Sequence, residues 1–387
     1  MTDSGMHLQR VLQRSALGPV QLHVLALVTR EMGRTLTVSF AERSPIGPRA
    51  IRVHLDSDLA DPHRQQHFEH WLKTQDWVHE VALRPPNLYL GPTLESLRDW
   101  ATGSVSVQEK LFKNDSVRHR VIVRLNSPLD PSAQSLDALR QVTMAEALAT
   151  LLRSQGHDTS LEYAVTAHHL EVIFLADDNQ PDTVIPLTVG GVDVPAGPLR
   201  ARYGGRLCAD NLFVAARELI AQHHGNADRT DQCEDYSRAF VRFALVRTER
   251  SRRIQLDNLK LTSELATFDL VLSALSMPQL EPRLANGEEG ARELAMELDL
   301  LPAMAQRAVN ELDPAPLTRS LRTLAERAWS ARARLASADP LRRALSVALG
   351  EVLEITGIVE ARGDDLIRSE IGTVPVMREC YERANGI

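Results

Sequence analysis

Cysteine and aromatic residues are scarce in this chain, and each shortage narrows the kinds of site that it can hold. Of its 387 residues, three are cysteines and 4% are aromatic. The cysteines, Cys208, Cys233 and Cys380, lie far apart and form no Cys-x-x-Cys pair, which argues against a disulfide framework or a cysteine-based zinc site. We therefore expect a reduced, cytoplasmic protein without a metal, whose cores are built from leucine, valine, isoleucine and alanine.

The chain also lacks long hydrophobic runs and an excess of positive charge. Its apolar stretch at 20–28 is interrupted by Gln21 and His23, so we expect neither a signal peptide nor a membrane-spanning segment. The formal net charge is −7. Because binding to a phosphate backbone requires clustered lysine and arginine, this charge disfavours indiscriminate nucleic-acid binding but permits a local basic face.

Hydrophobic patterning divides the chain into three predicted domains. Residues 1–115 mix short alternating strands with helical stretches, which is typical of an α+β domain. Residues 116–230 open with the apolar strand 121–125, a loop and a helix, the order in which a doubly wound α/β sheet begins. Residues 231–387 show helical periodicity and predict an all-α bundle. The predicted fold class is therefore α/β plus all-α, with a Rossmann-like middle domain.

Within these domains, periodicity and capping residues set the expected elements. Helices are expected at 10–33, 67–74, 136–156, 210–223, 237–247, 262–276, 291–300, 304–312, 313–335 and 341–355. Strands are expected at 36–40, 50–55, 77–83, 121–125, 170–175 and 183–189, with a break at 85–87. Asp313 followed by Pro314 indicates a helix start, and Gly357 indicates a helix end.

Segment 126–158 carries a run of short motifs, which read Asn-Ser-Pro at 126–128, Leu-Arg-Gln at 139–141, Ala-Glu-Ala-Leu-Ala at 145–149 and Gln-Gly-His-Asp at 155–158. Their order resembles the nucleotide-binding entry of arginyl-tRNA synthetases, a class I family. There, a strand ends in Ser-Ser-Pro-Asn, and a helix beginning with Leu-Arg-Ser ends at Gly-His. The His-x-Gly-His signature of the family is missing, since Ser135 and Ala138 stand in place of its histidines and Asp137 in place of its glycine.

The three replacements predict that ATP activation is lost. The family histidines donate hydrogen bonds to phosphate oxygens as the adenylate forms, whereas Ala138 cannot donate and Ser135 is short and uncharged. The family glycine lets adenine lie against the backbone, while Asp137 adds bulk and a negative charge beside a polyanion. We therefore expect no catalytic residue and no cofactor, and we expect Asp137 to cap a helix.

A second family motif, a basic loop of the Lys-Thr-Arg type, has a degraded counterpart at 191–212. Arg200 and Arg202 stand at its basic positions, where they either contact phosphate or remain as surface charges. Asp137 and Arg200 are 63 residues apart, whereas two βαβ halves need about 30 residues each before any insertion. The resemblance therefore implies a truncated Rossmann-like domain whose amino-acid pocket is missing or collapsed.

The carboxyl-terminal region resembles the DALR-type anticodon-binding bundle of the same family, with similar segments at 237–245, 254–257, 324–329 and 344–358. Residues 1–115 are similar only in order and position to the domain of the family that touches the tRNA elbow. Charge is uneven in the bundle. Segments 238–260 and 319–343 each hold seven bases and two acids, whereas 281–313 holds eight acids and three bases.

Two basic stretches on one helical domain could follow a phosphate backbone, so the sequence predicts a tRNA-binding set. The set comprises Arg238, Arg242, Arg247, Arg250, Arg252, Arg253, Arg327, Arg332 and Arg334. The opposing interpretation is that these are solvated helix faces whose basic residues pair with the acidic segment.

Other features are weaker candidates. His63, His67 and His70 have a helical spacing that could suit a metal, but no cysteine or acidic triad completes the site, so a solvated helix face is favoured. Trp71 and Trp77 are favoured as core residues over a base-stacking platform.

The resulting hypothesis is a non-catalytic tRNA-binding protein, derived from arginyl-tRNA synthetase, that recognises tRNA or presents it to a partner enzyme. tRNA-Arg is one candidate, and scarce lysine suggests a bacterial source. Two alternatives stay open. One is a minimal ligase-like enzyme that still uses ATP or an aminoacyl donor. The other is a protein-interaction subunit that no longer binds RNA.

Overall fold

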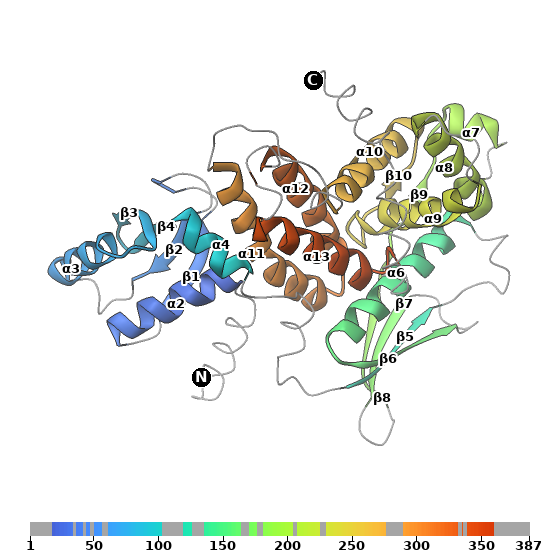
Figure 1. Ribbon diagram of the computed structural model, residues 1–387. Coiled ribbons are helices and arrows are strands. Elements are labelled where there is room, and N and C mark those ends of the chain that lie inside the picture. Colours follow the sequence, from blue (N-terminus) through green and yellow to red (C-terminus); the bar gives the residue numbers. More distant parts are fainter. Residues whose placement is uncertain are drawn as a thin grey trace. The chain divides into compact units, whose positions relative to one another are not determined.

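The computed structural model in Figure 1 describes residues 18–33, 36–41, 44–46, 50–55, 61–102, 119–125, 135–163, 170–175, 181–203, 207–224, 230–275, 289–331, 335 and 339–359. They belong to two compact units. Unit 1 takes its residues from 1–106, 280–303 and 327–345, and unit 2 from 107–279, 304–326 and 346–387. The three domains expected from the sequence stay a prediction, because segments of the carboxyl-terminal region contribute to both units.

Unit 1 contains an antiparallel four-stranded sheet in the order β1-β2-β4-β3. The strands are β1 (Thr37–Ala41), β2 (Ala50–His54), β3 (Val78–Arg84) and β4 (Asn87–Pro92). The accompanying helices are α2 (Pro19–Met32), α3 (Pro62–Lys73) and α4 (Leu94–Thr102). The sequence predicted all of these except β4 and α4, and the expected break at 85–87 is the hairpin turn between β3 and β4, where the Pro85–Pro86 peptide is cis.

Helix α11 (Glu289–Asn310) supplies unit 1 with a buried carboxylate. Asp299, which is 1% exposed, accepts hydrogen bonds from the backbone N–H groups of Val20 at 2.7 Å and Gln21 at 3.3 Å. These N–H groups have no partner within α2, so the carboxylate both caps that helix and complements its dipole. The prediction of two helices, at 291–300 and 304–312, is wrong, since Pro302 lies inside one continuous helix. The packing of buried neighbours such as Leu301 outweighs the hydrogen bond that the proline removes.

Unit 2 contains a mixed sheet in the order β6-β5-β7-β8. Its elements are β5 (Arg120–Leu125), α6 (Leu136–Ser154), β6 (Asp158–Tyr163), β7 (Leu170–Leu175) and β8 (Pro181–Leu187). Strands β5 and β6 are parallel and connected through α6, whereas β7 is antiparallel to β5 and β8 is antiparallel to β7. The sequence predicted strand 121–125 and the helix that follows it but not β6, and the expected doubly wound continuation is replaced by a hairpin among the described strands. The connections after β6 and β7 are too short for the dozen or so residues that a parallel crossover requires.

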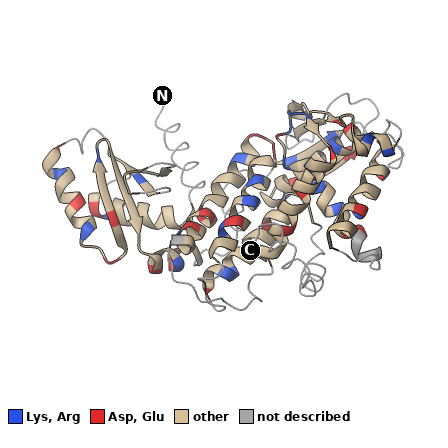
Figure 2. Cartoon of the chain, turned by 90° about the horizontal axis from the view of Figure 1, so that it is seen from above, with Lys and Arg blue, Asp and Glu red and all other residues tan. Residues whose placement is uncertain are grey.

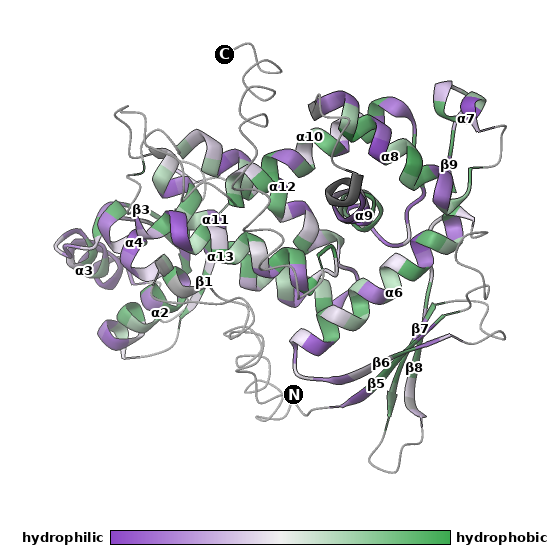
Figure 3. Ribbon diagram, turned by 45° about the vertical axis from the view of Figure 1, so that its right-hand side comes forward, coloured by the Kyte–Doolittle hydropathy of each residue, from purple (hydrophilic) through white to green (hydrophobic). Residues whose placement is uncertain are grey.

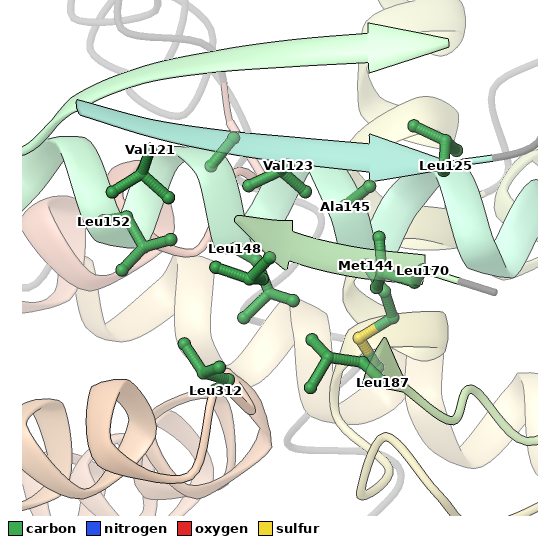
Figure 4. Packing of buried hydrophobic residues seen from close by; sticks show 12 residues of the cluster. Val121, Val123, Leu125, Met144, Ala145, Leu148, Leu152, Leu170, Leu187 and Leu312 are labelled. Atoms are coloured by element: carbon green, nitrogen blue, oxygen red, sulfur yellow. The ribbon is translucent and has the colours of Figure 1, made fainter. Parts of the chain in front are cut away.

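Helix α6 covers one face of this sheet, as Figures 1 and 4 show. Met144, Leu148 and Leu152 recur every four residues, are at most 1% exposed, and belong to one core cluster with Val121 and Val123 of β5. Removing each large apolar side chain from water contributes about 1.5–3 kcal/mol. Figure 3 shows the corresponding hydrophobic segments on α6 and on the strands beside it. The packed sheet therefore holds α6 in place.

The other elements are helices that the periodicity largely predicted and one short ribbon that it did not. The helices are α7 (Pro198–Arg202), α8 (Ala209–His224), α9 (Thr230–Val246), α10 (Asn258–Leu275), α12 (Ala315–Ala331) and α13 (Pro340–Ile355). The ribbon consists of β9 (Val192–Asp193) and β10 (Ile254–Gln255), which pair in parallel. Among the described helices, none has both the length and the hydropathy to cross a membrane.

Two predicted helix boundaries are confirmed, one by a hydrogen bond and the other by its backbone conformation. The Asp313 carboxylate accepts from the backbone N–H of Ala315 at 3.0 Å, at the start of α12. Gly357 has a φ of +65°, and a Cβ there would lie 3.3 Å from the Cα of Ala147. Both the backbone conformation and the close approach to α6 favour glycine, which ends α13.

Candidate functional site

The start of helix α6 carries the three positions at which the family signature is replaced. The Ser135 hydroxyl accepts a hydrogen bond from the backbone N–H of Ala138 at 3.2 Å, and Ser135 has the extended backbone of an N-cap residue. Ser135, and not Asp137, therefore caps this helix, which corrects the expectation for Asp137. A serine three residues before the capped N–H is an ordinary helix start, so this role was readable from the sequence.

Asp137 instead binds the ribbon. One carboxylate oxygen, Oδ1, accepts a hydrogen bond of 2.6 Å from the backbone N–H of Val192 in β9. A Cβ at Gly191 would lie 3.0 Å from the same oxygen, so the two segments are in close contact. Carboxylates are favourable in the first turn of a helix because its N-terminus carries partial positive charge. That is also where helices bind phosphate groups, so the chain places its own anion at this end of α6.

One turn further along α6, the buried guanidinium of Arg140 holds the two segments that lead into this ribbon. Its Nη1 donates to the carbonyl oxygens of Gly190 at 2.6 Å and Gly191 at 3.3 Å, and to that of Arg252. Its Nη2 donates to the carbonyl oxygen of Glu249 at 3.0 Å. The residue is 0% exposed. Burial lowers the pKa of Arg140 to about 10, an effect that nearby carboxylates partly oppose, so the side chain stays charged at neutral pH.

Backbone hydrogen bonds complete the connection between 190–193 and 250–256. The N–H of Gly190 donates to the carbonyl of Arg250 at 2.8 Å, and the N–H of Ile254 donates to the carbonyl of Gly191 at 2.9 Å. A Cβ at Gly190 would lie 2.2 Å from the carbonyl oxygen of Arg252, so this position requires glycine. The ribbon thereby brings Arg250, Arg252 and Arg253 to the start of α6, although they follow it by more than 100 residues.

The arginines predicted to bind tRNA fall into two groups: an engaged group, whose side chains are held by contacts within the fold, and an exposed group. Arg250 belongs to the engaged group. Its Nε donates to the carbonyl of Leu312 at 3.1 Å and its Nη1 to that of Thr188 at 2.9 Å. Its backbone N–H donates to the Asp313 carboxylate at 2.9 Å. Burial lowers the pKa of Arg250, while Asp313 opposes that shift. These contacts give Arg250 a structural role in the turn that it occupies.

Arg242 of α9 and Arg247, which directly follows that helix, also have contacts within the fold. Arg242 donates to the carbonyl of Gly357 at 3.1 Å and to the Glu146 carboxylate at 3.0 Å, and so connects α9 to α6 and to the end of α13. Arg247 forms an ion pair of 2.5 Å with Glu264, and the two side chains are 15% and 5% exposed. A charge this deeply buried depends on its partner.

Arg252 and Arg253 form the exposed group at the ribbon. Their side chains are 72% and 73% exposed, and they pair with Glu249 at 2.7 Å and Asp193 at 3.1 Å. Arg319 shares Glu249 at 3.3 Å and is 46% exposed. Exposed ion pairs contribute about 0–1 kcal/mol, so a phosphate group can replace such a carboxylate at little cost. Figure 2 shows basic and acidic residues interspersed along the helices.

The other predicted site residues are not brought to the ribbon by any described contact. Arg238 pairs with Glu234 on the exposed side of α9 at 2.6 Å. On α7, Arg202 pairs with Glu218 at 2.6 Å, and Arg200 is exposed, with its Nη1 3.5 Å from the carbonyl of Val194. Arg327 belongs to unit 1, where it pairs with Glu293 at 2.6 Å. Arg332 and Arg334 lie outside the described residues.

Within the described part of the chain, no three potential metal ligands come together. His63, His67 and His70 lie exposed on α3. Trp71 and Trp77 are half-buried and contact other aromatic rings, with centroids 5.7 Å from Phe68 and 5.6 Å from Trp100, respectively.

Comparisons with known proteins agree with this architecture at the level of fold. No family model matches the sequence, and no curated protein does. Among solved structures, Thermus thermophilus arginyl-tRNA synthetase aligns with a TM-score of 0.53 at 12% identity, over 87% of this chain and 98% of that one. The fold resembles that of arginyl-tRNA synthetases. Arginyl-tRNA synthetase from Plasmodium falciparum aligns at 8% identity with a TM-score of 0.48, over 94% of this chain and 99% of that one.

Proposed function

We propose that this chain binds tRNA through exposed arginines at the β9–β10 ribbon and does not activate an amino acid with ATP. The observation that carries the proposal is the hydrogen bond between the Asp137 carboxylate and the backbone N–H of Val192. It puts a negative charge where a phosphate group would otherwise meet the N-terminus of α6. The arginyl-tRNA-synthetase-like fold supports a role connected with tRNA.

The loss of catalysis follows from what the first turn of α6 offers to a nucleotide. The Ser135 hydroxyl is used by the Ala138 N–H, and Ala138 has no side-chain donor. A triphosphate approaching this turn would be repelled by Asp137 and would have to break its bond to the ribbon. Stabilising the charge that develops during adenylate formation needs preorganised donors, and these side chains offer only the one uncharged hydroxyl of Ser135.

The binding of RNA is argued from charge and exposure. Arg252 and Arg253 extend from a backbone held by buried contacts, and among the described residues their guanidinium groups form ion pairs with Glu249 and Asp193. Arginine contacts phosphate oxygens with up to two parallel N–H groups, which makes it well suited to an RNA backbone. Recognition of tRNA for a partner enzyme remains part of this proposal, with tRNA-Arg as one candidate.

A gel shift with total tRNA at low, stated salt tests binding, and arginine-dependent pyrophosphate exchange tests catalysis. We expect a shifted complex with the unsubstituted protein and no exchange above background. Robust exchange would overturn the non-catalytic part of the proposal in favour of the ligase-like alternative. Absence of a shift at low salt would overturn the RNA-binding part.

The protein-interaction subunit remains a second candidate because of one observation. Each described arginine of the predicted tRNA-binding set has an acidic or carbonyl partner within the chain, as expected if these charges serve the fold alone. The candidates differ in what happens when Arg252 and Arg253 lose their charge. Only the RNA-binding function predicts a loss of tRNA affinity.

A further inference from the structure

We propose that Arg140 is a positioning residue, which holds the ribbon so that Arg252 and Arg253 can bind a polyanion as a preorganised pair. This inference rests on the proposed tRNA binding for its functional half. The structural role of Arg140 is argued from contacts alone, because this one buried side chain of α6 donates to four carbonyl groups on two segments distant in sequence.

The position of these carbonyl groups connects Arg140 directly to the exposed pair. The carbonyl of Arg252 itself accepts from Arg140, and the carbonyl of Glu249 begins the turn that leads to it. Gly190 and Gly191 precede the β9 residues that pair with β10 and that include Asp193, the partner of Arg253. Moving the Arg140 guanidinium would therefore shift both the segment that carries the two exposed arginines and the segment 190–193 that pairs with it.

The chemistry of the contact needs the shape of a guanidinium as well as its charge. Arginine offers five N–H donors in a fixed planar fork, whereas lysine offers three donors at a single point. Nη1 alone contacts carbonyls on both segments, but a lysine ammonium ends one bond short of that position and offers no second nitrogen for the carbonyl of Glu249. Arg140→Lys thus keeps the charge and removes much of the geometry.

Asp137 provides a second, independent hold on the same ribbon. It lies three residues before Arg140 on α6 and accepts from the N–H of Val192, while Arg140 donates to the carbonyls just before that residue. Neighbours three residues apart share a helix face. One face of α6 therefore binds both a backbone N–H group and backbone carbonyl groups of the same short segment, 190–192.

The test combines hydrogen exchange with a double-mutant cycle on tRNA affinity. In Arg140→Lys, we expect the amides of Gly190, Ile254 and Leu256 to exchange at least about tenfold faster, with that of Val123 in the sheet unchanged. In the unsubstituted background, Arg252→Gln/Arg253→Gln should weaken tRNA binding about tenfold or more. In the Arg140→Lys background the same pair of substitutions should weaken tRNA binding by less than about twofold, because the two arginines are no longer preorganised there.

Arg153→Lys is the matched control, since Arg153 also lies on α6 and donates to a backbone carbonyl, that of Thr159 at 3.0 Å. It should leave tRNA affinity and ribbon exchange unchanged. If Arg140→Lys fails to fold, Asp137→Ala is used in its place because it loosens the same strand. In that background too, Arg252→Gln/Arg253→Gln should weaken tRNA binding by less than in the unsubstituted protein. Equal losses of tRNA affinity in the unsubstituted and Arg140→Lys backgrounds would overturn the inference. So would unchanged amide hydrogen exchange at the ribbon in Arg140→Lys. If the unsubstituted protein binds no tRNA, the proposed function fails, and hydrogen exchange still decides whether Arg140 holds the ribbon.

Discussion

At the scale of single residues, the function of an arginine in this chain depends on how much of its charge water can reach. Arg247 is 15% exposed and faces a carboxylate that is 5% exposed, whereas Arg253 is 73% exposed and faces one that is 47% exposed. In the first pair, removing one partner leaves the other charge buried. In the second, water replaces the lost partner.

Arg247→Ala should therefore destabilise the protein by about 2–3 kcal/mol, since it leaves Glu264 buried with Lys260, at 2.6 Å, as its ion-pair partner among the described residues. Arg253→Ala should change stability by less than about 0.5 kcal/mol. Urea unfolding followed by circular dichroism measures both. Similar losses in the free energy of unfolding for the two variants would contradict the distinction between engaged and exposed arginines.

His157 should make the stability of the protein depend on pH. Its Nδ1 lies 3.3 Å from the backbone N of His119 and can accept that hydrogen bond only when unprotonated. Burial, and to a lesser degree His119, lower the pKa of His157 below its ordinary 6.5. The folded state thus binds this proton less readily than the unfolded state does, so stability is complete above pH 6.5 and decreases as pH falls through the folded-state pKa.

The comparison that isolates this effect is unfolding by urea at pH 7.5 and pH 5.5, with His157→Asn as the reference. The asparagine side chain can accept the same hydrogen bond and does not titrate. The unsubstituted protein should lose more stability than the variant between the two pH values. An equal loss in both proteins would show that other groups cause the pH dependence.

At the scale of elements, glycine has opposite roles at two positions of unit 2. Gly357 needs a positive φ and closely approaches α6, whereas Gly350 lies inside α13, where a Cβ would be 3.8 Å from the nearest side-chain atom, Cδ1 of Leu275. Gly357→Ala should cost about 1–2 kcal/mol. Gly350→Ala should stabilise by about 0.5–1 kcal/mol, because alanine is the better helix former. Thermal unfolding would contradict this account if both substitutions shifted the midpoint in the same direction.

The elements also show what the sequence could predict and what it could not. Helices α9 and α13 are amphipathic, whereas α6 and α10 are largely apolar and buried, and the local pattern predicted all four. Pro302 broke the pattern of α11 locally, but tertiary packing kept the helix continuous. The β9–β10 ribbon has two residues per strand and joins segments some 60 residues apart, and no local pattern records such a pairing. The order of the motifs identified positions 135, 137 and 138 as candidate site residues. Arg140 appeared only as one residue of the Leu-Arg-Gln motif, and its contacts with the ribbon segments were not predicted.

At the scale of the whole chain, fold resemblance and charge give different kinds of information. The similarity to a synthetase at 12% identity describes the architecture and says nothing about chemistry. A net charge of −7 makes any binding to RNA dependent on local features. The ribbon is such a feature, because its two arginines are exposed while Arg140 and Asp137 hold their backbone in place.

The most direct test is the salt dependence of tRNA affinity, measured by fluorescence anisotropy, for the unsubstituted protein and two double variants. Each phosphate contact contributes about 0.7–0.9 to the slope of log K against log salt. Arg252→Gln/Arg253→Gln should lower that slope by more than one. Arg153→Gln/Arg322→Gln, which removes two exposed arginines elsewhere in unit 2 that contact Thr159 and Glu326, should not change it. Equal slopes for all three proteins, or no measurable binding to tRNA, would contradict the account.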